Sequence, residues 1–267
     1  MREEKVRLAN QVTLHCLINP NEQKEWILLS NSLGATSEMW TDQIEVLSEH
    51  FQVLRYDTRG HGQSSCPEGP YSFDDLCEDV IGLLNYFEIK KANFMGLSLG
   101  GMTGLGLAIN HPNRISRVVC ADARAEATEM FKAMWDERIF KVASGGLNAI
   151  LDGTITSWFT SDWIEANPSK IQTIKDMILS NNPKGYIYCC EALKELNYLT
   201  QLNTIKVPVL YVGGDQDKGA PPETMKEMAD KTPFSIYECI ANSAHVANIN
   251  NADEFNQKVL SYLTSLD

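Results

Sequence analysis

The sequence predicts an α/β protein in which helices cover both faces of a mostly parallel sheet. Short apolar runs such as 26–29 and 51–56 have the composition of strands that are buried on both faces. Segments such as 73–87, with apolar residues at three- and four-residue intervals, alternate with these runs. This alternation is typical of a sheet whose parallel strands are joined by helices.

The first half of the chain supplies most of the expected elements. We expect β-rich pieces or strands at 6–9, 12–17, 26–29, 51–56, 92–95 and 115–121. Helices are expected between the later strands, at 39–47, 73–87 and 102–111.

The alternation stops near residue 122, and the interval that follows is helical in composition, with aromatic clusters around Trp135 and Trp158. The pattern resumes with a strand at 207–212, a helix at 221–231, a strand at 235–240 and a helix at 253–266. We therefore expect an α/β core of residues 1–123 and 204–267. A helical lid of residues 124–203 is inserted into it.

Charge and cysteine content argue against several classes of protein. The 267 residues are 43% hydrophobic and can fill a sizeable core. A formal charge of −12 disfavours nucleic-acid and anionic membrane surfaces, because both require a positive field. We see no signal peptide and no transmembrane run. The seven cysteines are scattered without a CxxC motif, so we expect neither disulfides nor a zinc site, and a reducing cytoplasm fits best.

One serine lies in an unusual setting, the stretch GLSLG at 96–100, between an expected strand and an expected helix. This is the context of a nucleophile elbow, in which a strained turn exposes Ser98 and frees the backbone N–H of Leu99 for an oxyanion. An incidental serine in a glycine-rich turn is the structural alternative.

A serine nucleophile requires a base, and His245 is the candidate among five histidines. It follows the last expected strand, where a loop can return to the carboxyl edge of the sheet. The other four histidines are more simply structural or solvated.

An acid that orients the histidine should follow a strand and lie between serine and histidine in the chain. Asp215 and Asp217 follow the strand at 207–212, and Asp122 follows the strand at 115–121. We prefer Asp217 and keep Asp122 as the second choice. A second oxyanion donor is expected from the stretch SNSLG at 30–34, where Leu33 would supply its backbone N–H.

With these residues, the chain resembles the α/β-hydrolase fold and, within it, the 3-oxoadipate enol-lactonases of aromatic catabolism. The resemblance covers the chain nearly end to end, through the stretches SNSLG, LRYDTRGHGQSS, GLSLGGMTG, NPKGYIYCCEAL and AHVANI. GLSLGG and the histidine are common to the superfamily, whereas SNSLG together with YDTRGHG, GGMTG and GYIYCC is much more specific to the enol-lactonases and their close relatives. Two stretches depart from the family pattern, ADARAEAT and GGDQDKGAPP, and both are expected near the pocket.

The resemblance implies a small-molecule lactone as substrate and a mechanism that needs no metal or organic cofactor. A lactone that carries a carboxylate needs a cation nearby, and Arg124 and Arg138 are the candidates, although each could instead form a surface ion pair. The resemblance places Trp135 in the pocket, and Trp158 is a further candidate. The sequence leaves the oligomeric state open.

Three other functions remain compatible with these residues. The same triad could serve a general carboxylesterase or a perhydrolase. A ligand sensor without turnover is a candidate of another class, although a pure binder has no need for serine, acid, histidine and oxyanion loop together.

Overall fold

In the computed structural model, which describes residues 1–21 and 24–265, the strands of that part of the chain form one eight-stranded sheet. Their order is β1-β2-β4-β3-β5-β6-β7-β8, with β1–β2 and β2–β4 antiparallel and the other neighbours parallel. The predicted fold class is thereby confirmed. The strands are Arg2–Arg7 (β1), Thr13–Asn19 (β2), Trp26–Ser30 (β3), Gln52–Tyr56 (β4), Ala92–Leu97 (β5), Ile115–Ala121 (β6), Val209–Gly214 (β7) and Ser235–Ile240 (β8).

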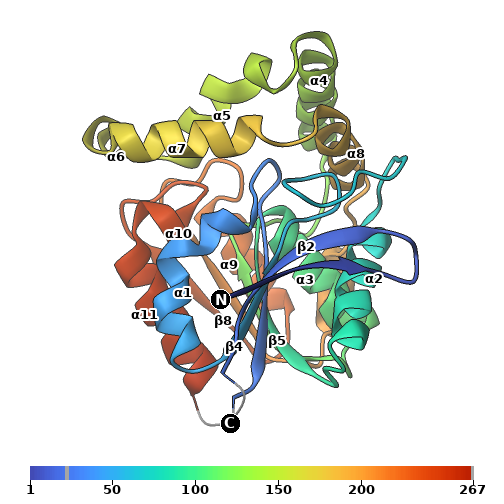
Figure 1. The fold of residues 1–267 in the computed structure, drawn as a ribbon. Helices are drawn as coiled ribbons and strands as arrows, with labels where there is room; N and C mark the ends of the chain where they lie inside the picture. Colours follow the sequence, from blue (N-terminus) through green and yellow to red (C-terminus); the bar gives the residue numbers. More distant parts are fainter. Residues whose placement is uncertain (22–23, 266–267) are drawn as a thin grey trace.

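Helices cover both faces of the sheet, with α1 and α11 on one side and α2 and α3 on the other (Figure 1). The α-helices are Thr41–Ser48 (α1), Phe73–Tyr86 (α2), Leu99–Asn110 (α3), Glu129–Gly145 (α4), Leu151–Trp158 (α5), Ser161–Ala166 (α6), Pro168–Leu179 (α7), Pro183–Lys194 (α8), Pro222–Lys231 (α9), Ala247–Asn250 (α10) and Ala252–Thr264 (α11). Short 3₁₀ helices span Ser37–Trp40, Leu147–Ile150 and Leu199–Thr204.

Successive residues of the central strands enter two different cores. On β3, Ile27 and Leu29 belong to the cluster that contains Phe255 of α11, whereas Leu28 belongs to the cluster that contains Val80 of α2. Side chains of a strand point alternately to opposite faces, so a strand between two helical layers is apolar at every position. This explains why the unbroken apolar runs of the sequence predicted buried strands.

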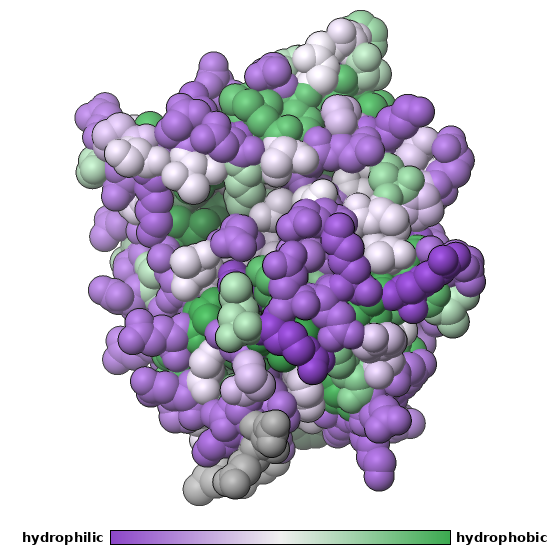
Figure 2. All heavy atoms as spheres, viewed as in Figure 1, coloured by the Kyte–Doolittle hydropathy of each residue, from purple (hydrophilic) through white to green (hydrophobic). Residues whose placement is uncertain are grey.

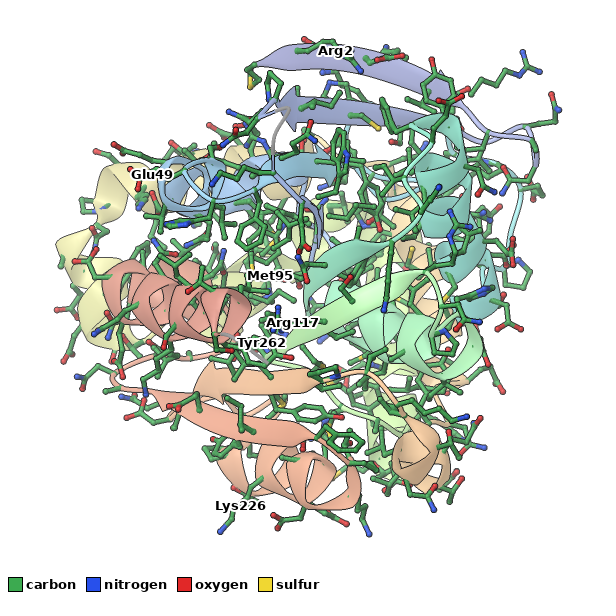
Figure 3. All side chains as sticks on the ribbon, turned by 90° about the horizontal axis from the view of Figure 1, so that it is seen from below. Arg2, Glu49, Met95, Arg117, Lys226 and Tyr262 are labelled. Atoms are coloured by element: carbon green, nitrogen blue, oxygen red, sulfur yellow. The ribbon has the colours of Figure 1, made fainter. Side chains whose placement is uncertain are left out.

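The face of the molecule shown in Figure 2 is mostly polar around this interior. Met95 of β5 lies inside when the sheet is seen from below, whereas Arg2 and Lys226 lie at opposite outer ends (Figure 3). Hydrophilic side chains cover most of the face in Figure 2. None of the helices in residues 1–21 and 24–265 is long and apolar enough to cross a membrane.

The start of α2 is specified locally by a capping box. The hydroxyl of Ser72 accepts from the amide of Asp75, and the carboxylate of Asp75 accepts from the amide of Ser72. Each bond satisfies a backbone N–H at or near the helix start that has no partner within the helix. The helix therefore begins at the predicted residue, Phe73.

Other boundaries differ from the predicted ones. α3 begins at Leu99, three residues before the expected position, because Gly100 belongs to the first helical turn and not to the loop before it. The expected strand at 207–212 lies at 209–214, after Pro208, which has no N–H for the sheet. α11 ends at Thr264, and the expected last residue, Leu266, lies outside the described residues.

Between β6 and β7 the chain leaves the sheet and forms α4 to α8, which lie above it in Figure 1. The two ends of this segment pair with each other. The amide of Ala127 donates to the carbonyl of Leu196 at 2.8 Å, and the amide of Tyr198 donates to the carbonyl of Ala125 at 2.7 Å. The segment therefore leaves and re-enters the core at one place.

Candidate active site

Ser98 lies in a strained turn between β5 and α3. Its φ of 54° and ψ of −113° are rare for a residue with a side chain. Two glycines make the turn possible: a Cβ atom on Gly96 would lie 2.1 Å from the carbonyl oxygen of Gly100, and one on Gly100 would lie 2.2 Å from that of Ser30. The turn holds the side chain of Ser98 at the edge of a cavity.

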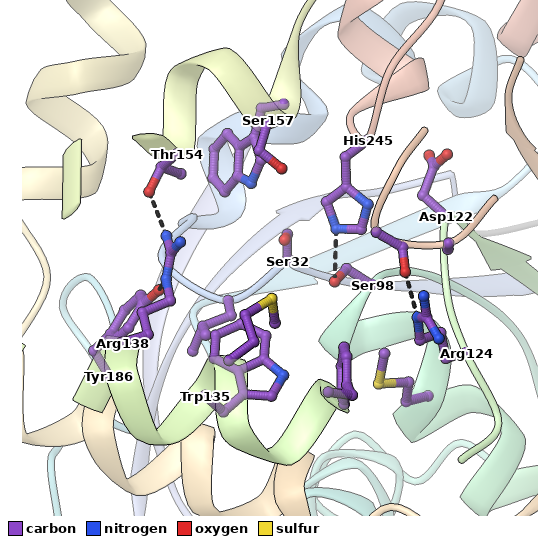
Figure 4. Close-up of a pocket in the computed structure, with 17 residues that line it drawn as sticks. Ser32, Ser98, Asp122, Arg124, Trp135, Arg138, Thr154, Ser157, Tyr186 and His245 are labelled. Carbon is purple, nitrogen blue, oxygen red and sulfur yellow. Dashed lines mark hydrogen bonds between the residues drawn. The ribbon is translucent and has the colours of Figure 1, made fainter. Parts of the chain in front are cut away.

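Three side chains from different loops form a hydrogen-bonded chain. The Oγ of Ser98 lies 3.0 Å from Nε2 of His245 (Figure 4), and Nδ1 of His245 lies 2.8 Å from Oδ2 of Asp217. The carboxylate can only accept, so Nδ1 carries the proton and Nε2 is free to accept from the serine. This is the geometry of a serine activated by a base that a third group orients.

Neither of the other two candidate acids is hydrogen-bonded to the imidazole of His245 in the described part of the chain. Asp122 is fully buried, and it accepts from the amides of Gly214 at 2.9 Å and Ala247 at 3.3 Å. Asp215 accepts from the amide of Ser243 at 3.0 Å. Asp122 and Asp215 thus brace the loops that carry Asp217 and His245.

The carboxylates around His245 set its protonation. Burial by itself would lower the pKa of His245, but the charge and hydrogen bond of Asp217, together with the charge of Asp122, raise it above 6.5. Burial and the neighbouring Asp217 raise the pKa of Asp122 well above its usual range. The imidazolium that forms when His245 takes a proton is therefore stabilised.

Two backbone amides are free to donate near the serine. Within the described part of the chain, the amides of Leu33 and Leu99 donate to no acceptor. Leu33 lines the same cavity as Ser98. Leu99 is the first residue of α3, where the helix dipole favours negative charge.

The four predicted substrate-binding residues line one cavity with Ser98 and His245 (Figure 4). These are Arg124, Trp135, Arg138 and Trp158. The cavity measures about 90 Å³, whereas one water needs only about 10–15 Å³. Trp163, a third tryptophan of the helical segment, stacks on Phe159 with ring centroids 4.4 Å apart and is not part of the lining.

The two arginines lie on opposite sides of Ser98 in Figure 4, and within the described residues their hydrogen-bond partners are a carbonyl and two hydroxyls, not carboxylates. Arg138 donates to the hydroxyls of Tyr186 and Thr154 and lies over the ring of Trp135, 5.7 Å from its centroid. Arg124 donates to the carbonyl of Gly219. An arginine side chain is a cation in proteins, so two cations line the cavity.

Several polar lining residues were not assigned from the sequence. The sequence predicts only a turn-shaping role for Ser32, beside Leu33, and no role for Tyr186 in the stretch GYIYCC. Thr154 and Ser157 also line the cavity from α5. These two residues are three positions apart and so lie on one face of a helix, and this spacing in the expected helical segment could have identified them as neighbours.

Trp135 has one unsatisfied polar group in this setting. Its Nε1 is buried and has no partner in the described chain. An indole N–H is a donor only, and a buried donor normally finds an acceptor. A bound ligand could supply that acceptor.

Comparisons with known proteins identify the fold family of the chain. The family model described as the alpha/beta hydrolase fold matches residues 25–252. "3-Oxoadipate enol-lactonase 2" of Acinetobacter baylyi is 35% identical over 94% of this chain and 93% of its own. The crystal structure of the enol-lactonase from Burkholderia xenovorans has a TM-score of 0.94 and 37% identity, covering 98% of this chain and 100% of that one.

A further relative has a different name. "Putative carbamate hydrolase RutD" of Caulobacter segnis is 26% identical over 91% of this chain and 93% of its own. The family model alone covers more than half of the chain, and the eight-stranded sheet has the corresponding architecture. The chain belongs to the alpha/beta hydrolase fold family.

Proposed function

We propose that this protein is a serine hydrolase that opens an enol-lactone ring, converting 3-oxoadipate enol-lactone to 3-oxoadipate in aromatic catabolism. The observation that carries the proposal is a serine–histidine–aspartate chain opening into a small cavity that also contains two arginines without carboxylate partners in the described residues. The relatives named as enol-lactonases support the choice of ring.

The proposed reaction has two steps. Ser98 attacks the ring carbonyl while His245 takes its proton, and Asp217 holds the imidazole in the required tautomer. The amides of Leu33 and Leu99 donate to the oxyanion of the tetrahedral intermediate. Collapse breaks the bond to the ring oxygen, and the enolate that leaves is protonated and becomes a ketone. Water activated by His245 then releases the acid from the serine ester.

We assign Arg138 to the substrate carboxylate. The charges of Asp217, Glu126 and Glu223 act on Arg124, so part of its field is already offset. The two side-chain partners of Arg138 are neutral hydroxyls, which fix its guanidinium without neutralising it. A fixed guanidinium matches the two oxygens of a carboxylate.

The segment 124–203 is proposed as the lid of this site, over a core of 1–123 and 204–267. It contributes residues of α4, α5 and α8 to the cavity, and closure over the substrate would exclude water. The seven cysteines are free, which fits the reducing cytoplasm that we propose as the location.

A substrate panel tests the proposed activity. We expect kcat/KM for 3-oxoadipate enol-lactone to exceed that for p-nitrophenyl acetate and for a simple alkyl carbamate by at least about tenfold. The carbamate is included because of the relative named as a carbamate hydrolase. Equal or lower turnover of the lactone would reject the lactonase and favour a general esterase or a carbamate hydrolase.

Covalent labelling separates an enzyme from a sensor. A fluorophosphonate reacts with an activated serine, so we expect the wild type to be labelled and Ser98→Ala to be unlabelled. A wild type that binds the lactone but resists labelling would indicate a binder without turnover.

A further inference from the structure

The turn that carries Leu33 is held at the next residue, Gly34, from both sides. The amide of Gly34 donates to Nε2 of His61 at 3.0 Å, and its carbonyl accepts from Nδ2 of Asn181 at 2.8 Å. His61 is 1% exposed and Asn181 is 4% exposed, so water does not compete for either bond. Both backbone polar groups of Gly34 are thus bound to buried side chains.

The remaining amides of this turn are also bound, with one exception. Ser32 donates to the sulfur of Met39 at 3.3 Å, and Ala35 donates to the carbonyl of Ser32 at 3.1 Å. With Gly34 bound to His61, the amide of Leu33 is the one in residues 32–35 without an acceptor in the described chain. The turn therefore presents a single free N–H, at the residue that lines the cavity.

His61 can accept from Gly34 in only one protonation state. Its Nδ1 lies 3.2 Å from the carbonyl of Arg59, which only accepts, so Nδ1 carries the proton and Nε2 presents a lone pair. Burial lowers the pKa of His61, which keeps the imidazole neutral. An imidazolium would face the N–H of Gly34 with another N–H and break the bond.

Asn181 connects this turn to the helices above the core. It follows α7, and its Nδ2 also lies 3.0 Å from the carbonyl of Met177 and 3.1 Å from that of Ile178, where the helix ends. An amide NH2 has two hydrogens, so these three acceptors share them. Its Oδ1 accepts from the amide of Gly62 at 2.8 Å. One side chain thus joins the end of α7 to the turn of Gly34 and to the loop that contains His61.

The backbone conformation of Gly34 and its close approach to Tyr186 also fix the position of the turn. Its φ is +81°, and a Cβ atom there would lie 3.2 Å from Cε2 of Tyr186. The turn is therefore packed against α8 as well as bonded to the loop after β4 and to the end of α7. A shift of α8, of the loop after β4 or of the end of α7 would therefore move the peptide group between Leu33 and Gly34.

We propose that His61 and Asn181 are positioning residues of the oxyanion site, which hold Gly34 so that the N–H of Leu33 stays aimed into the cavity beside Ser98. The inference rests on the proposed serine-hydrolase function. It assigns a role to the histidine of the RGHG stretch and makes the end of α7 part of the catalytic framework. Neither residue lines the cavity, so both act through the backbone of the turn.

Paired substitutions of His61 distinguish loss of its hydrogen bond with Gly34 from loss of the imidazole ring. In His61→Asn the side-chain amide of the asparagine can still donate to the carbonyl of Arg59, as Nδ1 does, but the asparagine side chain is too short to reach the amide of Gly34. In His61→Gln an amide oxygen can take the place of Nε2 and accept from Gly34. Asn181→Asp replaces the donor to Gly34 by an oxygen and keeps an acceptor for Gly62. His50→Asn, at an exposed histidine after α1, is the matched control.

Loss of one oxyanion donor lowers kcat by a factor of about 10²–10³. A donor that is displaced but still present should lower kcat by a smaller factor. With p-nitrophenyl acetate we expect His61→Asn and Asn181→Asp to lower the acylation rate about 10- to 100-fold with KM nearly unchanged. His61→Gln should stay within about threefold of the wild type, and His50→Asn should match it.

A second readout distinguishes positioning from a merely structural role. A trifluoromethyl ketone, which forms a tetrahedral adduct with the serine, should bind the two impaired variants more weakly by the same factor as the loss in rate. A short carboxylic acid, which forms no adduct, should bind as it does to the wild type. Because the variants act on opposite sides of Gly34, either one carries the test if the other fails to fold.

Three results would overturn the inference alone: wild-type rates in both impaired variants, an equal loss in His61→Gln and His61→Asn, or parallel weakening of both ligands. These results require an active, fluorophosphonate-labelled wild type. A wild type that is neither labelled nor active would reject the proposed function, and the inference with it.

Discussion

Two buried carboxylates lie near His245, and their bonds separate their roles. Asp217 is hydrogen-bonded to the imidazole at 2.8 Å, whereas the two carboxylate oxygens of Asp122 accept from the amides of Gly214 and Ala247. Both carboxylates raise the pKa of the histidine, but only one can fix its tautomer. Sequence position alone left both open, because each follows a strand and precedes the histidine. The deciding information is the path of the loop after β7.

Substitution of the two acids should therefore have different effects. Asp217→Asn should lower kcat by about 10³–10⁴-fold, because the amide no longer favours the tautomer in which Nε2 accepts. Asp122→Asn should lower kcat by less than about tenfold but reduce the free energy of unfolding by about 1–3 kcal/mol, because one buried amide loses its acceptor. Steady-state kinetics and urea unfolding measure the two quantities. The reverse order of the kinetic effects would transfer the acid role to Asp122.

The raised pKa of His245 predicts the acid limb of the pH profile. The base must be neutral, so kcat/KM should fall as pH decreases through a pKa that lies above 6.5. In Asp217→Asn the residual activity should persist to lower pH, because the substitution removes the larger of the two carboxylate contributions that raise this pKa, and burial is then opposed by the charge of Asp122. Asp230→Asn, at an exposed carboxylate on α9, is the control and should leave the limb in place. An unshifted limb in Asp217→Asn would contradict the assignment.

At the scale of elements, the strand-to-helix turn was predictable, whereas the walls of the cavity were predictable only in part. The glycines around Ser98 indicate a turn in any context, since only glycine tolerates such close backbone contacts. Many of the lining residues come from α4, α5 and α8, and the direction of their side chains depends on how these helices cross above the sheet. Apolar periodicity indicates that a helix exists but does not say which face meets a distant serine. Thus Tyr186 and Thr154 were missed, although their helical segment was expected.

The turn itself gives a test at this scale. Gly100→Ala would place a Cβ atom 2.2 Å from the carbonyl oxygen of Ser30, where two backbone segments would have to separate. We expect it to lower the free energy of unfolding by more than about 2 kcal/mol and to abolish activity.

Gly153→Ala is the matched control for this substitution. A Cβ atom at this exposed position of α5 meets nothing within 4 Å. It should raise stability by about 0.5–1 kcal/mol, because alanine favours the helix. Chemical denaturation compares both variants with the wild type. A stable and active Gly100→Ala would mean that the turn tolerates a separation of β3 and α3.

At the scale of the whole molecule, the proposed substrate and the protein carry charge of the same sign. A net charge of −12 repels an anionic lactone at long range, although salt screens much of this beyond about 8–10 Å. Attraction must therefore come from cations inside the cavity, where screening is weak. The cavity has two of them on opposite sides of Ser98. A general esterase for neutral substrates would have no use for this arrangement.

This contrast gives the last prediction, which compares an anionic substrate with a neutral one. Arg138→Gln should raise KM for the anionic lactone about 10- to 100-fold, because a charge-assisted bidentate contact is lost. It should change KM for neutral p-nitrophenyl acetate by less than about threefold. Arg2→Gln, at an exposed arginine on β1, changes the net charge equally and should affect neither substrate. If Arg124→Gln but not Arg138→Gln weakened binding of the anionic lactone selectively, the substrate carboxylate would bind at Arg124, on the other side of Ser98. Equal losses for both substrates would show that Arg138 acts through packing against Trp135 and Tyr186, since its guanidinium lies over both rings.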